Sequence, residues 1–157
     1  VLRDDRHIYV MFDSFSLLSL GALMRRRFRV KGVIVWDKVN IGMGHYFRRS
    51  HELVVFACKG QRRLSRRDLA DVWRIKRLHR AAYPTQKPVE LFARMLQGSV
   101  EPEMVVCDPF CGSASSAIAA LAAGCSFVGA DLSASACDLA RERCATFAAT
   151  GQDPLEG

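Results

Sequence analysis

The sequence has no long hydrophobic run and few of the residue pairs that mark a metal site. No apolar stretch approaches the roughly 18 residues of a membrane-spanning helix, and the first residues, VLRDDRHIYVMF, lack the charged-then-apolar pattern of a signal peptide. None of the six cysteines forms a C-x-x-C pair, and with four histidines a zinc site would need scattered ligands. We therefore expect a cytoplasmic protein without a metal or membrane site, whose cysteines are reduced and pack in the core.

Acidic side chains are scarce in the first part of the chain. Residues 1–94 contain 21 Lys/Arg and 8 Asp/Glu, a balance of +13, whereas residues 95–157 contain 2 and 8, a balance of −6. Half of the 157 residues are hydrophobic, which is enough for one folded domain with a core. The separation of charge indicates a polyanion bound on one side, and a merely solvated surface is the alternative.

Hydrophobic runs and turn residues predict strands and helices in alternation. We expect strands at 7–12, 33–36, 53–57, 104–107 and 126–130, and helices at 15–27, 88–97, 115–123 and 135–148. Ser135 and Asp138 are placed as the capping box of the last helix. Residues 59–80, with nine basic and two acidic side chains and little periodicity, are interpreted as a loop or poorly packed arm, and the tail from Thr150 as frayed. The alternation predicts an α/β doubly wound sheet.

The segment from Met104 to Ser133 has the order strand, turn, helix, strand. The first strand ends in Asp108, the small residues Gly112, Ser113 and Ala114 form the turn, and the second strand ends in Asp131. In such sheets ligands bind at the carboxyl ends of the strands, and a carboxylate there can accept bonds from two ribose hydroxyls. Asp108 would repel a phosphate and suits a cationic group such as the methionine end of S-adenosylmethionine (SAM). The alternative is that each aspartate caps a helix.

Two motifs, met in this order, resemble a known family. YPTQKPVELF at residues 83–92, followed by DPFCGS at 108–113, is similar to motifs X and I of the β-group DNA amino-methyltransferases. These enzymes methylate the exocyclic amine of adenine (N6) or cytosine (N4) in DNA, and their motifs usually read HPTQKP and DPFxGSGTT. The stretches VWDK (35–38), GMG (42–44), HE (51–52) and DVW (71–73) also resemble the family, so the likeness spans about residues 7–148.

The resemblance implies a Rossmann-like, SAM-dependent methyltransferase fold in permuted order, with the cofactor motif near the C-terminus. It implies SAM contacts from the methionine-end residues Asp108, Phe110, Gly112 and Ser113, the ribose and adenine residues Asp131 and Leu132, and the carboxylate-binding residues Thr85 and Lys87. It implies double-stranded DNA as partner, with phosphate contacts from Arg48, Arg49, Arg62, Arg63, Arg66 and Arg67.

Three departures from the family pattern stand out. Tyr83 replaces the usual histidine, and Ala114 replaces a glycine, which would strain the cofactor turn if that position needs a positive φ. The tetrapeptide D-P-P-Y or S-P-P-Y, which would hold the flipped base, does not occur. We interpret it as lost before Val1, and therefore expect no catalytic residue in this chain, no activity of the chain alone, and no way to tell adenine from cytosine.

The family's tetrapeptide strand lies between the strands expected here at 104–107 and 7–12. Its absence predicts two unpaired strand edges, which pair directly or are filled by another copy or a complementing chain. We expect one domain over 1–157, comprising a catalytic-side half (1–58), a basic arm (59–82), a SAM-binding half (83–148) and a tail (149–157). The alternatives are a non-catalytic DNA-binding remnant and a methyltransferase acting on RNA or a small molecule.

Overall fold

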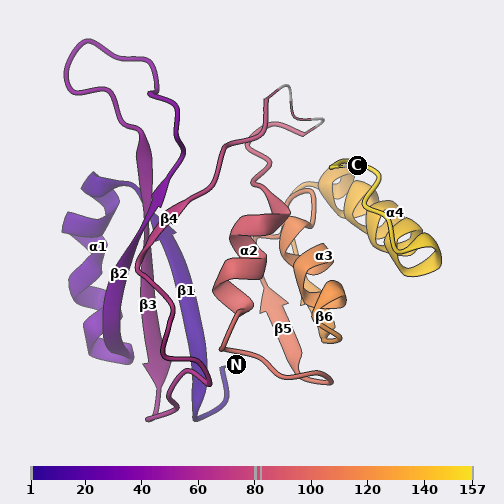
Figure 1. Ribbon diagram of the computed structural model, residues 1–157, viewed down its shortest axis with the longest axis horizontal. Coiled ribbons are helices and arrows are strands. Elements are labelled where there is room, and N and C mark those ends of the chain that lie inside the picture. Colours follow the sequence, from indigo (N-terminus) through magenta and orange to yellow (C-terminus); the bar gives the residue numbers. More distant parts are fainter. Residues whose placement is uncertain (1, 80, 82, 157) are drawn as a thin grey trace. The chain divides into compact units, whose positions relative to one another are not determined.

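The computed structural model describes residues 2–79, 81 and 83–156. Contacts within the chain divide it into two compact units, Val1–Arg77 and Leu78–Gly157, and the border lies inside the arm expected at 59–82. Each unit is an α/β layer structure with its own sheet (Figure 1). None of the helices in the described part of the chain is long and apolar enough to cross a membrane.

Unit 1 is built on a four-stranded sheet in the order β1-β3-β2-β4. Its elements in chain order are β1 (Arg6–Phe12), α1 (Ser14–Arg27), β2 (Arg29–Asp37), β3 (His51–Lys59) and β4 (Val72–Arg74). Strand β3 runs antiparallel to both β1 and β2, and β4 runs parallel to β2, so β3 alone is reversed. The core of the sheet includes Trp36, Val54 and Ala57, each at most 2% exposed.

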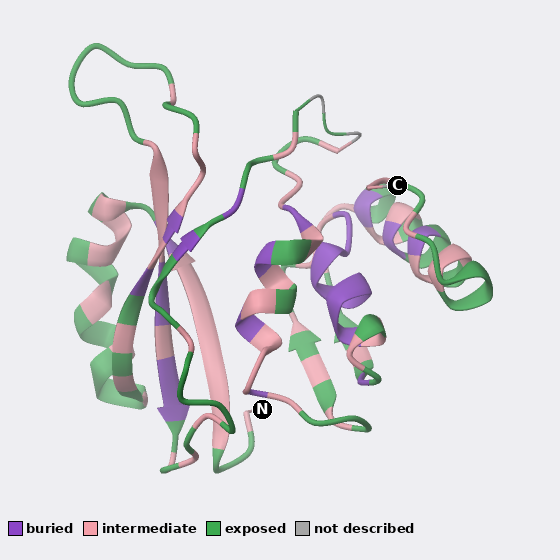
Figure 2. Ribbon diagram, in the orientation of Figure 1, coloured by how far each residue is buried: buried purple, intermediate pink, exposed green. Residues whose placement is uncertain are grey.

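Helix α1 begins where the sequence places it. The Asp13 carboxylate accepts hydrogen bonds from the backbone N–H groups of Phe15 and Ser16, which caps the helix. The helix ends in three arginines, which is favourable at the negative end of the helix dipole. None of its residues is fully buried, so α1 covers the sheet loosely (Figure 2).

The basic segment after β3 packs more closely than expected. Residues 72–74 form β4, and Trp73 and Ile75 are buried, so the interpretation of 59–80 as a poorly packed arm is wrong for this part. The Trp36 indole N–H donates to the carbonyl oxygen of Ile75 at 2.8 Å. Two aromatic side chains thus attach the segment to the sheet, while residues 80 and 82 lie outside the described residues.

Unit 2 contains a parallel strand pair joined by a helix. Its elements are α2 (Val89–Leu96), β5 (Val105–Asp108), α3 (Ser115–Ala122), β6 (Ser126–Gly129) and α4 (Ala134–Thr150). Helix α3 makes the crossover that parallel strands require, and six of its eight residues are buried (Figure 2). Ala114, Ala117 and Ala140 form a small core where α3 meets α4, so alanine allows the close approach of the two helices.

Three expectations for unit 2 and the cysteines are corrected. Helix α4 is capped by Ser133, which accepts from the N–H of Ala136, and not by Ser135 with Asp138. The tail is not frayed, since Gly151 ends the helix in the left-handed conformation and the following residues carry ordered hydrogen bonds. All six cysteines are free, but Cys107 is exposed, and the core contains Cys58 and Cys125.

The two strand edges expected to be open are found in separate sheets. Strand β1 pairs with β3 on one side, and β5 pairs with β6 on one side. Over residues 2–79, 81 and 83–156, no strand pairs with the second edge of β1 or with the second edge of β5. What occupies these edges remains a prediction.

Candidate functional site

The candidate site lies at the carboxyl ends of β5 and β6. Backbone bonds continue the strand pair beyond its ends: the N–H of Ala130 donates to the carbonyl oxygen of Asp108 at 3.0 Å, and that of Cys111 donates to Ala130 at 3.0 Å. Because the strands are parallel, their carboxyl ends meet at one edge of the sheet. Asp108 and Asp131 are therefore brought to the same edge, as the sequence predicts.

Asp108 holds the start of the loop to the helix behind it. One carboxylate oxygen accepts from the backbone N–H of Phe110 at 3.0 Å, and the other accepts from the Ser116 hydroxyl at 2.6 Å. The alternative that Asp108 simply caps the next helix is not what is seen, because α3 has no side-chain cap. No sequence pattern pointed to Ser116, since its contact with Asp108 depends on how α3 packs beside β5.

Asp131 holds the other side of the same loop. Its Oδ2 accepts from the N–H of Gly112 at 2.9 Å, and its Oδ1 accepts from the N–H of Ser133 at 3.0 Å. These backbone bonds, from Ser133 first and then Gly112, lower the pKa of Asp131, so the group is a carboxylate at neutral pH. A third backbone bond, from Leu132, contributes less, and a carboxylate with about four acceptor positions keeps at least one of them for a ligand.

The loop between the two aspartates contains two residues with positive φ, on either side of Ser113. Gly112 has φ +49°, and Ala114, which precedes α3, has φ 65° and ψ 29°. A left-handed conformation suits glycine and costs an alanine energy because of its Cβ. The condition that the sequence set for strain at Ala114, a positive φ, is therefore met.

The apolar side chains of the site face solvent. Phe110 is 83% exposed and Leu132 is fully exposed, although large apolar residues are usually covered. Leu132 directly follows Asp131, and Phe110 lies two residues after Asp108, so the edge offers anionic and apolar groups together. Burial, with the charges of Asp108 and Asp131, raises the pKa of the Cys111 thiol, which therefore stays protonated at neutral pH.

The second predicted segment meets this loop through Tyr83. A Cβ placed on Gly112 would lie 3.5 Å from a ring carbon of Tyr83. The N–H of Gln86 donates to the carbonyl oxygen of Tyr83, closing a tight turn in which Thr85 has φ 64°. Lys87 follows, half-buried. Ser113 is buried under the loop, and its carbonyl oxygen accepts from Arg143.

These residues fit SAM by the chemistry of their groups. The free lone pairs of Asp131 suit hydroxyl donors, the Asp108 carboxylate suits an ammonium group, and Phe110 and Leu132 suit a flat apolar ring. The turn at Gly112 has no Cβ, which leaves backbone accessible to a ligand.

The six arginines predicted to bind phosphate differ in their exposure to solvent and in their bonds to other residues. Arg63 and Arg67 are exposed, whereas Arg66 is paired with Asp68 and Arg62 is half-buried. Arg48 donates to the carbonyl oxygen of Gly42 at 2.7 Å. The Arg49 Nη1 lies 3.7 Å from the Asp13 Oδ1, and its guanidinium carbon lies 5.0 Å from the centre of the Phe15 ring. The six arginines are therefore not equally available to a phosphate.

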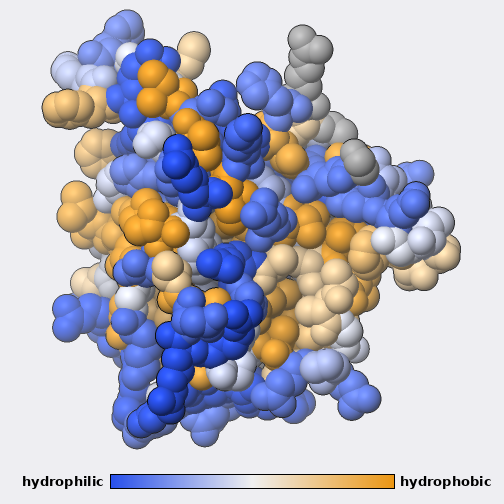
Figure 3. Space-filling model, in the orientation of Figure 1, coloured by the Kyte–Doolittle hydropathy of each residue, from blue (hydrophilic) through white to orange (hydrophobic). Residues whose placement is uncertain are grey.

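The loop between β2 and β3 extends beyond the strand ends (Figure 1). A backbone bond from Gly42 to Arg49, at 2.8 Å, keeps its two sides together. At its tip Met43, Tyr46 and Phe47 are each more than 90% exposed. On the face in Figure 3, hydrophilic residues predominate, with hydrophobic patches between them.

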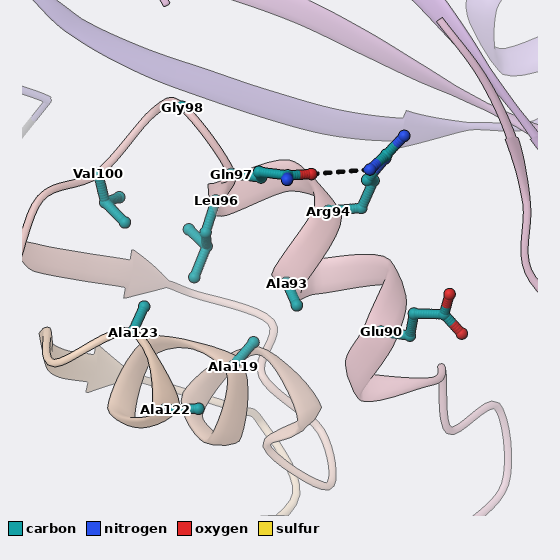
Figure 4. A pocket seen from close by; sticks show the side chains of 10 residues that line it. All are labelled: Glu90, Ala93, Arg94, Leu96, Gln97, Gly98, Val100, Ala119, Ala122 and Ala123. Atoms are coloured by element: carbon teal, nitrogen blue, oxygen red, sulfur yellow. Dashed lines mark hydrogen bonds between the residues drawn. The ribbon is translucent and has the colours of Figure 1, made fainter. Parts of the chain in front are cut away.

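A shallow groove lies elsewhere in unit 2. It is lined by residues of α2, the turn after it and the C-terminal end of α3, among them Arg94, Gln97 and Ala122 (Figure 4). The Arg94 guanidinium donates to the Gln97 side-chain oxygen at 2.8 Å, three residues further along the chain. The aspartate edge adjoins the other end of α3, about 12 Å away along an eight-residue helix, so the groove is a separate feature.

Known proteins resemble this chain along most of its length. A family model described as DNA methylase matches residues 1–142. YubD of Escherichia coli K12 is 32% identical over 134 residues, which are 84% of this chain and 59% of YubD. The type II methyltransferase M2.DpnII of Streptococcus pneumoniae is 26% identical over 165 residues, covering 91% of this chain and 62% of the relative. The chain thus spans about three-fifths of the length of these curated relatives.

Among solved structures, the M1.HpyAVI complex with SAM matches with a TM-score of 0.77 and 18% identity, over 90% of this chain and 75% of the other. The likeness confirms the predicted α/β, Rossmann-like fold of a SAM-dependent methyltransferase.

Proposed function

The chain belongs to the DNA methylase family, and on that premise we propose that it binds SAM at the carboxyl ends of β5 and β6, for methylation of an exocyclic amine of adenine or cytosine in double-stranded DNA. The observation that carries the proposal is the pair Asp108 and Asp131, which hold the glycine turn between them by backbone bonds. A dinucleotide site would place phosphate here and would not put two carboxylates at its mouth.

Each predicted contact has a supporting feature. Asp131 would take the ribose hydroxyls with its free lone pairs, and the exposed Leu132 would lie against the adenine. Asp108, with Phe110, Gly112 and the backbone of Ser113, would surround the methionine end. Thr85 and Lys87 would approach the carboxylate of SAM from the turn that begins at Tyr83, whose ring lies close to Gly112.

Bound SAM supplies an activated methyl group, and the contribution of this chain is to hold that group in one orientation. The rigid strand ends suit this task, because loops fixed to a sheet position a ligand more accurately than free loops do. We propose residues 83–148 as the SAM-binding half of a single methyltransferase domain.

DNA would be bound by the basic part of the chain. Arg63 and Arg67 are exposed and suit phosphate contacts, with Arg62 and Arg66 contributing less because they are half-buried or paired. Arg48 and Arg49 flank the loop whose tip exposes Tyr46 and Phe47. Exposed aromatic side chains beside arginines suit stacking on bases, so this loop is the second proposed contact.

These 157 residues contain no D-P-P-Y or S-P-P-Y tetrapeptide. We therefore expect the chain by itself to bind SAM and DNA without transferring the methyl group. Calorimetry with SAM tests the first point, and incorporation of radiolabel from SAM into DNA tests the second. Absence of SAM binding would overturn the proposed site, and label in the DNA would show that another group performs the catalytic step.

A non-catalytic DNA-binding remnant is the second candidate function. The observation that favours it is Ala114, a fully buried alanine in left-handed conformation within the cofactor turn. If strain there has abolished cofactor binding, the chain would retain salt-dependent DNA binding and show no heat of binding with SAM. The same calorimetry separates the two candidates.

A further inference from the structure

Among the residues that the structure describes, the most buried charged side chain is Arg143 of α4, with 1% exposure. It occupies the inward face of the helix at the spacing of the buried residues Ala136 and Ala140. An arginine in such a position is costly unless it is paired and its donors are used. Its partners therefore show what the side chain is for.

Two of its partners are in the C-terminal segment 151–156. Asp153 accepts from Nε at 2.8 Å and from Nη2 at 2.6 Å, a bidentate pair, and Glu156 accepts from Nη2 at 3.4 Å. The bidentate geometry is the strongest that an arginine and a carboxylate can form. These bonds hold the segment against α4.

On its other side Arg143 holds the cofactor turn. Nη1 donates to the carbonyl oxygen of Ser113 at 2.8 Å and to the Ser115 hydroxyl at 3.0 Å. These two residues flank Ala114, whose left-handed conformation is unfavourable on its own. Arg143 thus fixes the chain immediately before and after the strained residue.

Glu156 extends the same connection to the second cofactor segment. Its carboxylate accepts from the N–H of Val89 at 3.2 and 3.1 Å and from the Gln86 amide at 3.4 Å. Helix α2 begins here, and Pro88 before it offers no side-chain cap. A carboxylate at the N-terminus of a helix satisfies free N–H groups and favours the dipole, so Glu156 caps α2 from 67 residues away in sequence.

We propose that Arg143, Asp153 and Glu156 form a brace that sets the geometry of both cofactor segments, the turn 111–115 and the segment 83–89, and that the C-terminal segment is thereby part of the SAM site. The three are positioning residues, since the structure gives them contacts to the turn and to α2. The inference rests on the proposed SAM site. Without the brace the turn and the start of α2 lose their common anchor.

Glu156→Ala is the sharpest test, because it leaves the Arg143–Asp153 pair and the helix core intact. We expect the dissociation constant of SAM, measured by calorimetry, to rise about tenfold, the effect of losing one to two charge-assisted contacts. Glu156→Gln retains an acceptor for Val89 and should recover part of the loss. Arg143→Lys should weaken binding more, because a lysine cannot make the bidentate pair and reach the turn together.

Arg141→Ala is the matched control. Arg141 is on the same helix and forms an ion pair with Asp138, but both side chains are 76% exposed. It should leave SAM affinity within about twofold of the wild type, since exposed pairs contribute little. Thermal unfolding of every variant shows that binding is compared between folded proteins.

The outcomes separate the two proposals. If the wild type binds SAM and Glu156→Ala and Arg143→Lys bind it equally well, the brace is overturned and the SAM site stands. If Arg143→Lys does not fold, Glu156→Ala decides alone. If the wild type binds no SAM, the proposed site falls and the inference falls with it.

Discussion

Replacing Ala114 by glycine separates the cost of its backbone conformation from the value of its methyl group. The residue has φ 65° and is fully buried. Removing the buried methyl costs about 0.8 kcal/mol, and the added freedom of the unfolded chain costs about 0.5–1 kcal/mol. Relief of the left-handed strain stabilises the folded state by about 1–2 kcal/mol. The free energy of unfolding of unit 2 should therefore change by less than about 1 kcal/mol.

Ala117→Gly is the matched control. Ala117 is also fully buried, three residues further along in α3, but with helical geometry. Here the methyl loss of about 0.8 kcal/mol adds to a helix-propensity cost of about 1 kcal/mol, so unit 2 should lose about 2 kcal/mol. The two variants differ in whether strain is relieved.

Native-state hydrogen exchange of the α3 amides measures these changes, because it reports on unit 2 separately from unit 1. The two variants should differ by about 1–2 kcal/mol, which is the strain at Ala114. Equal destabilisation by both substitutions would refute the argument, since it would mean that the left-handed conformation costs nothing here. Calorimetry of the glycine variant should in addition show SAM binding at least as tight as in the wild type.

Three further predictions test the site and its surroundings. Asp131→Asn should weaken SAM binding about tenfold or more, because one oxygen cannot serve both backbone N–H groups and a ribose; unchanged affinity by calorimetry would exclude the ribose role. Burial opposes ionisation of Asp153, but its bonds to a guanidinium and to a backbone N–H outweigh it and lower its pKa. Its stabilising contribution is therefore present above the unfolded value of about 4 and is lost as pH falls through the lower folded value. The free energy of unfolding, followed by circular dichroism, should therefore fall less steeply with decreasing pH below about 4 in Asp153→Asn than in the wild type; an identical pH dependence in the two proteins would contradict a lowered pKa. Replacing Arg63 and Arg67 by glutamine should flatten the plot of log DNA affinity against log salt by up to about 0.9 per lost phosphate contact, whereas Arg141→Gln should not; an equal slope in all three proteins would place the DNA elsewhere.

The order and type of most elements followed from the sequence. Apolar runs of strand length, the Asp13 cap, the three arginines ending α1 and the alanine-rich α3 are local signals, and each predicted an element within a few residues of its observed bounds. The aspartate edge was predictable for the same reason, because a strand that ends in aspartate carries it to the carboxyl edge of the sheet. The family resemblance added the expected roles of the residues.

Tertiary structure decided what depends on partners distant in sequence. Strand β4 is only three residues long and lies in a segment rich in arginine and lysine. Trp73 is buried there because β4 pairs with β2, and no local sequence pattern predicts this pairing. The tail from Thr150 was expected to be frayed, but Asp153 and Glu156 pair with the buried Arg143, and Glu156 also caps helix α2. Arg143 lies at the helical spacing of the buried Ala136 and Ala140. Hydrophobic periodicity does not predict which carboxylates will form ion pairs with a buried arginine. Only the folded structure brings Arg143, Asp153 and Glu156 together, because hydrogen bonds and ion pairs depend on positions in space that a sequence pattern does not determine.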